Sequence, residues 1–200
     1  MQANRRKSGK SLKEDEQMSE ESFVLHSAPT LAGIKTANLF MTRNDNHDLV
    51  MNGIRHLNQL LTAKGIRVIP LKESKESILI YVYRPSCLIQ DFQNESLQKM
   101  LENLQYPTSN PDQCVVKLAQ RLKECKSFPH EIGLFLGYPP EDVRGFINNQ
   151  ARNYKCVGTW KVYGDEQEAK KKFDRYKRCT KDYCIRMQKG TVLEQLVVAM

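Results

Sequence analysis

The segment from residue 128 to residue 147 constrains the fold most strongly, because it places the start and stop signals of two short helices within twenty residues. Proline suits the first turn of a helix, and glycine suits the position just past its end. These signals predict one helix at about Pro129–Leu136, a stop at Gly137 and a second helix at Pro140–Asn149. The chain is therefore expected to turn sharply here between two closely packed helices.

The chain is expected to form a single globular domain, residues 23–200, behind a disordered polar tail, residues 1–22. The tail has no apolar stretch and cannot bury enough surface to offset the entropy lost on ordering. A chain of 200 residues with 40% hydrophobic content can build one core and is short for two. No segment resembles a signal peptide or a membrane span, so we expect a cytoplasmic location and six reduced cysteines.

Apolar periodicity predicts the remaining elements. The expected strands are 37–41, 66–71, 77–84 and 159–163. The second and third should pair as an antiparallel hairpin, because a short polar turn joins them. The expected helices are about 44–64, 85–104, 111–122 and a long one from Asp165, while residues 28–35 are expected to form a loop. The predicted class is α/β in the α+β sense: a helix-rich single domain with a small mixed β-sheet.

Positive charge is concentrated in the last quarter of the chain. The net charge is +8, and residues 150–190 hold twelve Lys or Arg against five Asp or Glu, a difference of +7. Most of these cations belong to the long helix from Asp165, whose apolar stripe includes Phe173 and Tyr176. Such a positive field attracts acidic or phosphate-bearing partners, although a helix face that meets only solvent would have the same composition.

His130 and Glu131 are the candidate acid–base pair, but they complete no known catalytic motif. A zinc-protease helix needs a second histidine four residues after the first, and position 134 is leucine. No cysteine pair has two-residue spacing, and no glycine-rich phosphate loop or nucleophile turn is present, so no metal site is predicted. The simplest interpretation is a helix cap formed by Ser127 and Glu131. In the alternative, an anion or cofactor group docks at the helix N-terminus beside His130.

A helix-turn-helix at Glu131–Asn149 is the nucleic-acid-binding alternative. The sequence pI is near 9.2, and residues of suitable size stand at Gly133, Gly137, Val143 and Phe146. The first turn of the second helix is acidic, however, where a DNA-reading helix must approach phosphates. A nucleic-acid partner is therefore possible on this pattern but is not the favoured interpretation.

Four stretches carry a resemblance to a known family. They are the loop at 28–35, the Pro-His-Glu-Ile-Gly-Leu-Phe-Leu-Gly-Tyr-Pro string within 128–147, the tripeptide at 153–155, and the run at 160–165 followed by Phe173, Tyr176 and Cys179. Together they resemble a bacterial family known only as a domain of unknown function, over about residues 24–190. The family is frequent in anaerobes and often encoded near flavodoxins and iron-uptake proteins, which implies a redox-linked or iron-linked accessory role. Relatives often carry cysteine where this chain has Ser27, so a thiol mechanism is not expected there.

These observations favour an accessory protein whose basic C-terminal helix binds an acidic partner, such as flavodoxin, or a phosphate-bearing cofactor. The candidate binding residues are Lys35, His130, Glu131, Tyr138, Arg144, Arg152, Lys155, Trp160, Lys161 and Arg175. One alternative is an enzyme that uses His130 and Glu131 as acid or base. Another is a haem or iron protein, for which the candidate ligands are His26, His47, His56 and His130.

Overall fold

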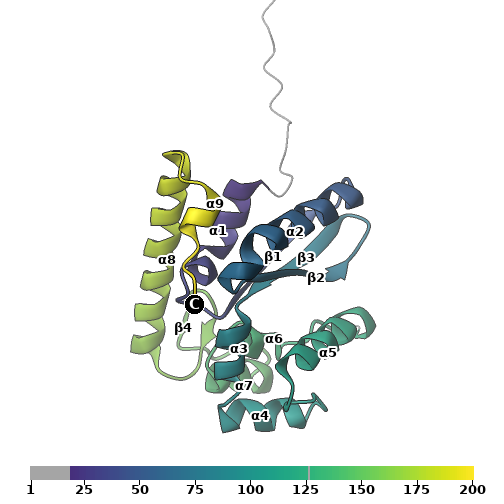
Figure 1. Ribbon diagram of the computed structural model, residues 1–200. Coiled ribbons are helices and arrows are strands. Elements are labelled where there is room, and N and C mark those ends of the chain that lie inside the picture. Colours follow the sequence, from purple (N-terminus) through teal and green to yellow (C-terminus); the bar gives the residue numbers. More distant parts are fainter. Residues whose placement is uncertain (1–18, 126) are drawn as a thin grey trace, which may run out of the picture.

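The computed structural model describes residues 19–125 and 127–200, and Figure 1 shows how their elements are arranged. The first helix, α1 (Glu20–Leu31), begins three residues before the expected start of the domain. Ser19 caps it by accepting a hydrogen bond from the Ser22 amide, and two glutamates in the first turn complement the positive helix end. The predicted tail, residues 1–22, therefore extends too far, because α1 already begins at Glu20. Residues 1–18 lie outside the described part of the chain.

The predicted loop at residues 28–35 is wrong for its first half, because α1 continues to Leu31. Pro29 lies inside the helix, where its ring removes one backbone hydrogen bond. Residues 28–31 are all buried, and this packing offsets the loss. Only residues 32–36 form the turn that leads to the first strand.

A three-stranded antiparallel sheet divides the domain. Its strands are β1 (Ala37–Arg43), β2 (Arg67–Glu73) and β3 (Ser77–Tyr83), in the spatial order β1-β3-β2. The predicted hairpin of β2 and β3 is confirmed, with a bulge between Pro70 and Lys72. The predicted class, a helix-rich α+β domain, is also confirmed, but the described strands of this sheet pair only antiparallel, so the sheet is not mixed.

One face of the sheet packs against an upper layer of helices (Figure 1). These are α1, α2 (His47–Leu61), α9 (Leu193–Leu196) and the C-terminal half of α8 (Glu166–Gln188), whose apolar residues share one core with residues of all three strands. A single-turn helix, η1 (Thr62–Lys64), follows α2. The chain then turns at Gly65, whose φ of +77° favours glycine.

The other face packs against a lower layer of shorter helices (Figure 1). They are α3 (Pro85–Asp91), α4 (Glu95–Glu102), α5 (Pro111–Glu124), α6 (Ile132–Phe135) and α7 (Pro140–Asn148). The helix predicted at 85–104 is in fact two helices, because the Asn94 side chain accepts from two amides and starts α4 anew. The helices predicted around 129–136 and 140–149 are both present, the first of them shorter.

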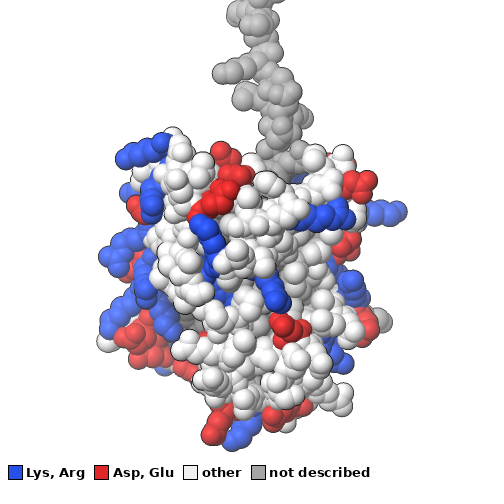
Figure 2. All heavy atoms as spheres, viewed as in Figure 1, with Lys and Arg blue, Asp and Glu red and all other residues white. Residues whose placement is uncertain are grey.

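The long helix α8 forms one edge of the molecule. Asp165 caps α8, so the predicted start of this helix is confirmed. The predicted apolar stripe faces inward, because Ala169 and Tyr183 are buried and Phe173 and Tyr176 are partly buried. Figure 2 shows lysine and arginine side chains along this edge, at the left of the view, with acidic ones gathered at its lower end. The basic side of α8 is therefore on the surface.

A small hairpin, β4 (Cys156–Val157) and β5 (Lys161–Val162), connects α7 to α8. Two glycines permit its close approach. A methyl group at Gly145 of α7 would overlap the ring of Tyr163, and one at Gly158 would overlap the ring of Phe173. The close packing of Tyr163 against α7 therefore requires a residue without a side chain at position 145.

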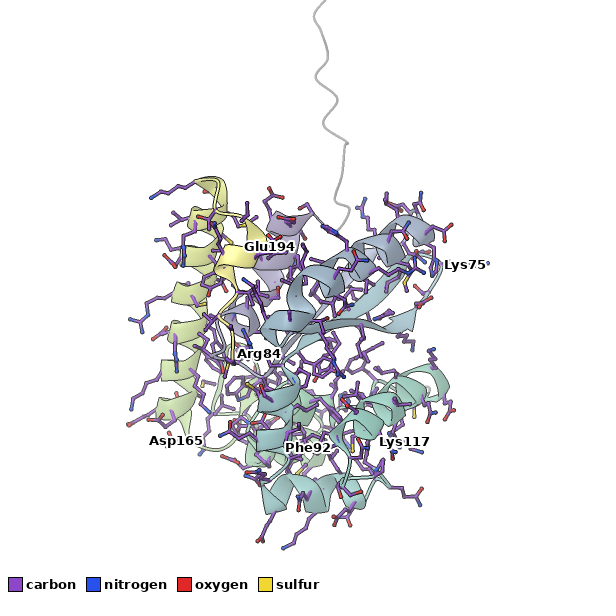
Figure 3. All side chains as sticks on the ribbon, viewed as in Figure 1. Lys75, Arg84, Phe92, Lys117, Asp165 and Glu194 are labelled. Carbon is purple, nitrogen blue, oxygen red and sulfur yellow. The ribbon has the colours of Figure 1, made fainter. Side chains whose placement is uncertain are left out.

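Arg84, directly after β3, ties the end of α1 to the C-terminal segment (Figure 3). It is fully buried. Its Nε donates to the Thr30 carbonyl at 2.7 Å, and Nη2 donates to the carbonyls of Leu31 at 2.7 Å and Val198 at 2.6 Å. Nη1 donates to the Lys64 carbonyl at 3.2 Å. The arginine therefore satisfies carbonyls of the last residues of α1 and η1, together with one carbonyl of the C-terminal segment.

Two further observations concern the described residues. No helix among them is both long enough and apolar enough to cross a membrane. All six cysteines lie within the described ranges, and each is free.

Candidate functional site

Lys35 lies in the turn between α1 and β1, and hydrogen bonds fix this turn on both sides of it. The Lys35 amide donates to the Pro29 carbonyl at 3.2 Å. The next residue, Thr36, donates from its hydroxyl to Asp91 at 2.5 Å and accepts at its carbonyl from the Arg84 amide at 3.0 Å. The backbone that carries the Lys35 side chain is therefore well anchored.

The Lys35 side chain contributes to a pocket of about 700 Å³ between α1, β1 and α8, which we call the Lys35 pocket. Its lining residues are Leu25, His26, Pro29, Lys35, Asn38, Leu39, Thr159, Phe173, Tyr176, Lys177, Thr180, Lys181, Cys184, Ile185 and Gln188. Three of these described residues are lysines, and none is Asp or Glu. The pocket therefore combines apolar walls with a positive potential, which attracts anions.

Lys35 is the most unusual residue of this pocket. Only 6% of it is exposed, and within the described chain no hydrogen bond or ion pair involves its amine. The amine lies over the ring of Tyr138, with Nζ 5.3 Å from the ring centroid. Burial disfavours the charged form and lowers the pKa of Lys35 to about 7. Near neutral pH the side chain therefore exists both as an ammonium ion and as a free amine.

The surface of α8 carries more positive charge than its own carboxylates neutralise. The helix holds eight Lys or Arg and four Asp or Glu. Its ion pairs are Lys170–Glu166, Lys171–Glu168 and Arg186–Asp182. Among the described residues, Arg175, Lys177, Arg178 and Lys181 are exposed and have no ion pair. Lys177 and Lys181 line the Lys35 pocket, so two of these cations stand where an anion could reach them.

A second pocket, of about 480 Å³, has a mainly apolar lining that includes five aromatic residues, and we call it the aromatic pocket. Its aromatic lining residues are Phe128, His130, Tyr138, Phe146 and Trp160, and Lys161 also lines it. Tyr138 stacks on Trp160 with ring centroids 4.8 Å apart, and His130 meets Phe146 edge-on at 4.9 Å. Because Thr159 lines both pockets and Lys35 lies over the Tyr138 ring, the two pockets are neighbours.

Glu131 is a buried structural residue and not an exposed acid. Its Oε1 accepts hydrogen bonds from the Arg121 guanidinium at 2.7 Å and from the Tyr106 hydroxyl at 3.0 Å. The helix α6 begins directly after it with no side-chain cap, so the predicted cap formed with Ser127 is wrong. His130 faces the aromatic pocket, whereas Glu131 does not line it. The two neighbours in the sequence therefore do not form an acid–base pair in this structure.

The first turn of α7 is covered by the β4–β5 hairpin. Asp142 is buried, and its Oδ1 accepts from the amides of Tyr163 and Gly164, each at 2.7 Å. Its Oδ2 accepts from the Trp160 indole at 2.6 Å. In a helix-turn-helix protein this first turn would approach the bases. The contacts of α7 therefore give the nucleic-acid alternative no support, and it stays an untested prediction.

The remaining candidate residues are spread over the surface. Arg144 donates to a serine hydroxyl of α4 at 2.5 Å, and Lys155 donates to a backbone carbonyl of the hairpin region at 2.6 Å. Lys161 donates to a backbone carbonyl at 2.8 Å and lies over the ring of a tyrosine. Arg152 and Arg175 are exposed. Of these five residues, only Lys161 lines one of the two pockets.

The structure thus divides the predicted site into two. Lys35 belongs to one pocket, His130, Trp160 and Lys161 belong to the other, and Tyr138 lies between them. The sequence-based list missed Lys177 and Lys181. Their spacing of four residues places them on one side of a helix, which is a detectable signal. That this side turns toward α1 could only come from the fold.

The four histidines do not share a site. His26 lines the Lys35 pocket, His130 lines the aromatic pocket, and His56 is exposed on α2. His47 lies 3.1 Å from a carboxylate oxygen of Glu73. Among the described residues, no group of three or more His, Cys, Asp or Glu could hold a metal ion.

Comparison with protein families decides the identity of the domain. The model of a family described as a protein of unknown function, DUF3793, matches residues 23–197. The chain belongs to the DUF3793 family. The resemblance to a domain of unknown function is thereby confirmed, and the DUF3793 match includes both pockets and all of α8. No curated protein and no solved structure matches the chain.

Proposed function

We propose that this protein binds a small anionic molecule, of the phosphate-bearing cofactor class, in the Lys35 pocket. The observation that carries the proposal is the buried side chain of Lys35, whose amine has no carboxylate partner within the described chain and which lines a pocket with two further lysines. An apolar residue would pack at this position without the cost of burying a charge. An anionic ligand would supply the missing partner.

The other lining residues support a ligand with a flat apolar part. Leu39, Phe173 and Ile185 offer apolar surface, while Asn38 and Thr180 offer hydrogen-bonding groups. Small-molecule sites typically combine mainly apolar walls with a few polar groups, in volumes of roughly 300–1,000 Å³. The Lys35 pocket, at about 700 Å³, has both properties.

An acidic protein partner is the second candidate. Arg175 and Arg178 are exposed on α8, have no ion pair among the described residues and do not line the pocket. They would speed encounter with an acidic surface such as that of flavodoxin. A redox-linked or iron-linked role of this kind rests on the resemblance alone.

Calorimetric titration with flavin mononucleotide and with riboflavin, which lacks the phosphate, tests the first candidate. The protein should bind the phosphorylated flavin more tightly, and added salt should weaken this binding. The double variant Lys177→Gln/Lys181→Gln should lose about tenfold in affinity, since exposed charge contacts are worth up to about 1 kcal/mol each.

The matched control is Lys75→Gln/Lys123→Gln, which removes the same charge from exposed positions that do not line the pocket. Equal losses in the two double variants would show that net charge alone attracts the ligand. Equal affinity for both flavins would show that the phosphate is not recognised. Heat with an acidic flavodoxin but with neither flavin would favour the second candidate.

A further inference from the structure

Lys35 differs from the other two lysines of the pocket in its burial, and this difference suggests a reactive amine. Lys177 and Lys181 are exposed on α8, where water keeps an ammonium ion charged. Lys35 is 6% exposed, and its amine lies over an aromatic ring with no carboxylate partner among the described residues. The pocket therefore holds one amine in apolar surroundings beside two hydrated cations. Lysines desolvated in this manner serve as nucleophiles toward carbonyl compounds.

We infer that Lys35 forms an imine with a ligand in this pocket, so that the ligand is an aldehyde or ketone that also carries an anionic group such as phosphate. The inference rests on the proposed function, because anion binding by Lys177 and Lys181 would hold the carbonyl carbon near the Lys35 amine. It extends that function from reversible binding to covalent capture.

The reaction needs no oxidant or reductant. The lone pair of the neutral Lys35 Nζ attacks the carbonyl carbon, and proton transfer gives a carbinolamine. The carbinolamine then loses its hydroxyl group together with the remaining proton on nitrogen, as water, and a carbon–nitrogen double bond forms. The products are one imine and one water molecule, and hydrolysis reverses the reaction.

Three features of the site favour this reaction. Burial lowers the pKa of Lys35 to about 7, so a substantial fraction is the free amine near neutral pH. Hydrogen bonds of Pro29 and Thr36 hold the turn in place, so the amine needs little rearrangement. Tyr176 lines the same pocket, and burial raises the pKa of its hydroxyl, which therefore stays protonated and is available as a hydrogen-bond donor to the ligand.

Pyridoxal 5′-phosphate is a suitable probe, because it carries an aldehyde, a phosphate and a flat ring. The full-length protein is incubated with it, the imine is followed by visible absorption, and borohydride reduction makes the bond permanent. Peptide mass spectrometry then locates the modified lysine. Pyridoxamine 5′-phosphate, which has an amine in place of the aldehyde, measures binding without imine formation.

The expected result is modification mainly at Lys35, with protection by pyridoxamine 5′-phosphate. Lys35→Met should remove most of the absorption band while the protein still folds, as judged by circular dichroism. The control variant Lys75→Met removes an exposed lysine that does not line the pocket and should form the imine as the wild type does. Lys177→Met keeps the amine of Lys35 but should bind the phosphate more weakly and form the imine more slowly. Pyridoxal, which lacks the phosphate, should react more slowly.

Three outcomes overturn the inference, and they are distinguishable. Modification spread over surface lysines and unaffected by Lys35→Met would show that Lys35 is not the reactive amine. If pyridoxamine 5′-phosphate binds in the pocket and the aldehyde still leaves Lys35 unmodified, covalent capture is refuted while anion binding stands. If neither compound binds and Lys35 reacts no faster than a surface lysine, both the capture and the anion pocket fail for this ligand class.

Discussion

Replacing Lys35 with methionine should stabilise the protein, and the gain should depend on pH in a defined direction. The folded protein holds Lys35 with a pKa of about 7, whereas an unfolded chain holds lysine near 10.5. Between these values the unfolded state binds more protons, so the stability of the wild type rises with pH through this window. Methionine has a similar shape and no proton to lose, so the variant lacks this dependence.

The size of the effect follows from the shift in pKa. A change from 10.5 to about 7 corresponds to about 5 kcal/mol at 1.36 kcal/mol per unit, which is the largest gain expected well below pH 7. Linkage predicts that about 2 kcal/mol of the difference disappears between about pH 6 and about pH 8.5. The cation–π contact with Tyr138 that the variant loses is worth only about 1 kcal/mol. The desolvation cost therefore dominates, and a stability cost at a binding residue is common in functional sites.

Urea unfolding of the wild type and Lys35→Met at about pH 6 and about pH 8.5 measures the difference in their free energies of unfolding. The other titratable groups of the pocket are His26, Tyr176, Lys177, Lys181 and Cys184, and they are present in both proteins, so their contributions cancel in the difference. Lys177→Met, an exposed lysine of the same pocket, is the matched control and should change stability little at either pH. A Lys35→Met variant that is less stable than the wild type, or a difference that does not change with pH, would refute the reasoning.

Three further substitutions test the contacts that position the pockets. Arg84→Lys should lower the free energy of unfolding by about 3 kcal/mol or more, because lysine cannot reach the separate carbonyls that the guanidinium serves; urea unfolding measures this. Asp142→Asn should lower it by about 2 kcal/mol and shift Trp160 fluorescence, since an amide nitrogen cannot accept from the indole N–H. Gly158→Ala should displace the hairpin from α8, because its methyl group overlaps the Phe173 ring, and should change the near-ultraviolet circular dichroism.

Each of the three substitutions has a measurable outcome that would contradict its prediction. Wild-type stability in Arg84→Lys would mean that the buried carbonyls find other partners. An unchanged emission spectrum in Asp142→Asn would mean that the indole does not depend on the carboxylate. For the glycine, Gly190→Ala is the comparison, because a methyl there meets nothing within 4 Å. Its positive φ adds some backbone strain, so the near-ultraviolet signal, more than stability, separates the two variants.

Some helices and strands are determined by the residues within them, and local sequence patterns predicted these elements correctly. The run of β-branched and aromatic residues at β3 and the apolar stripe of α8 were both interpreted correctly. β3 is buried on both faces, so its pattern is nearly continuous and easy to recognise. The class of the domain followed from these two signals and from the proline-punctuated helices.

Elements that depend on distant partners were predicted poorly. α1 passes through Pro29 because packing against the core stabilises it, and no local signal reports that packing. The break before α4 depends on the cap formed by Asn94, which also fits within a continuous helix pattern. Glu131 suits a helix cap by composition, but its actual partners stand on the segment before α5 and on α5 itself. For α1 and Glu131 tertiary contacts overrode the local preference, whereas the break before α4 is a local cap that the apolar pattern concealed.

The candidate site was predicted only in part, for the same reason. Lys35 and Tyr138 were both singled out, and the fold brings the amine over the ring. Arg144 and Lys155 were singled out as well, but they donate to oxygen atoms of the protein itself and line neither pocket. The special character of Lys35 arises from burial without a carboxylate partner, and burial of one charged side chain in a turn has no sequence signature.

The ionisation of Lys35 itself tests the account most directly. Nuclear magnetic resonance of lysine side chains labelled with carbon-13 can follow its titration with and without pyrophosphate. Lys35 should have a pKa of about 7 in the free protein and a higher pKa with the anion bound, because a nearby negative charge favours the ammonium form. A pKa near 10.5 in the free protein, or a pKa that does not respond to pyrophosphate, would contradict it.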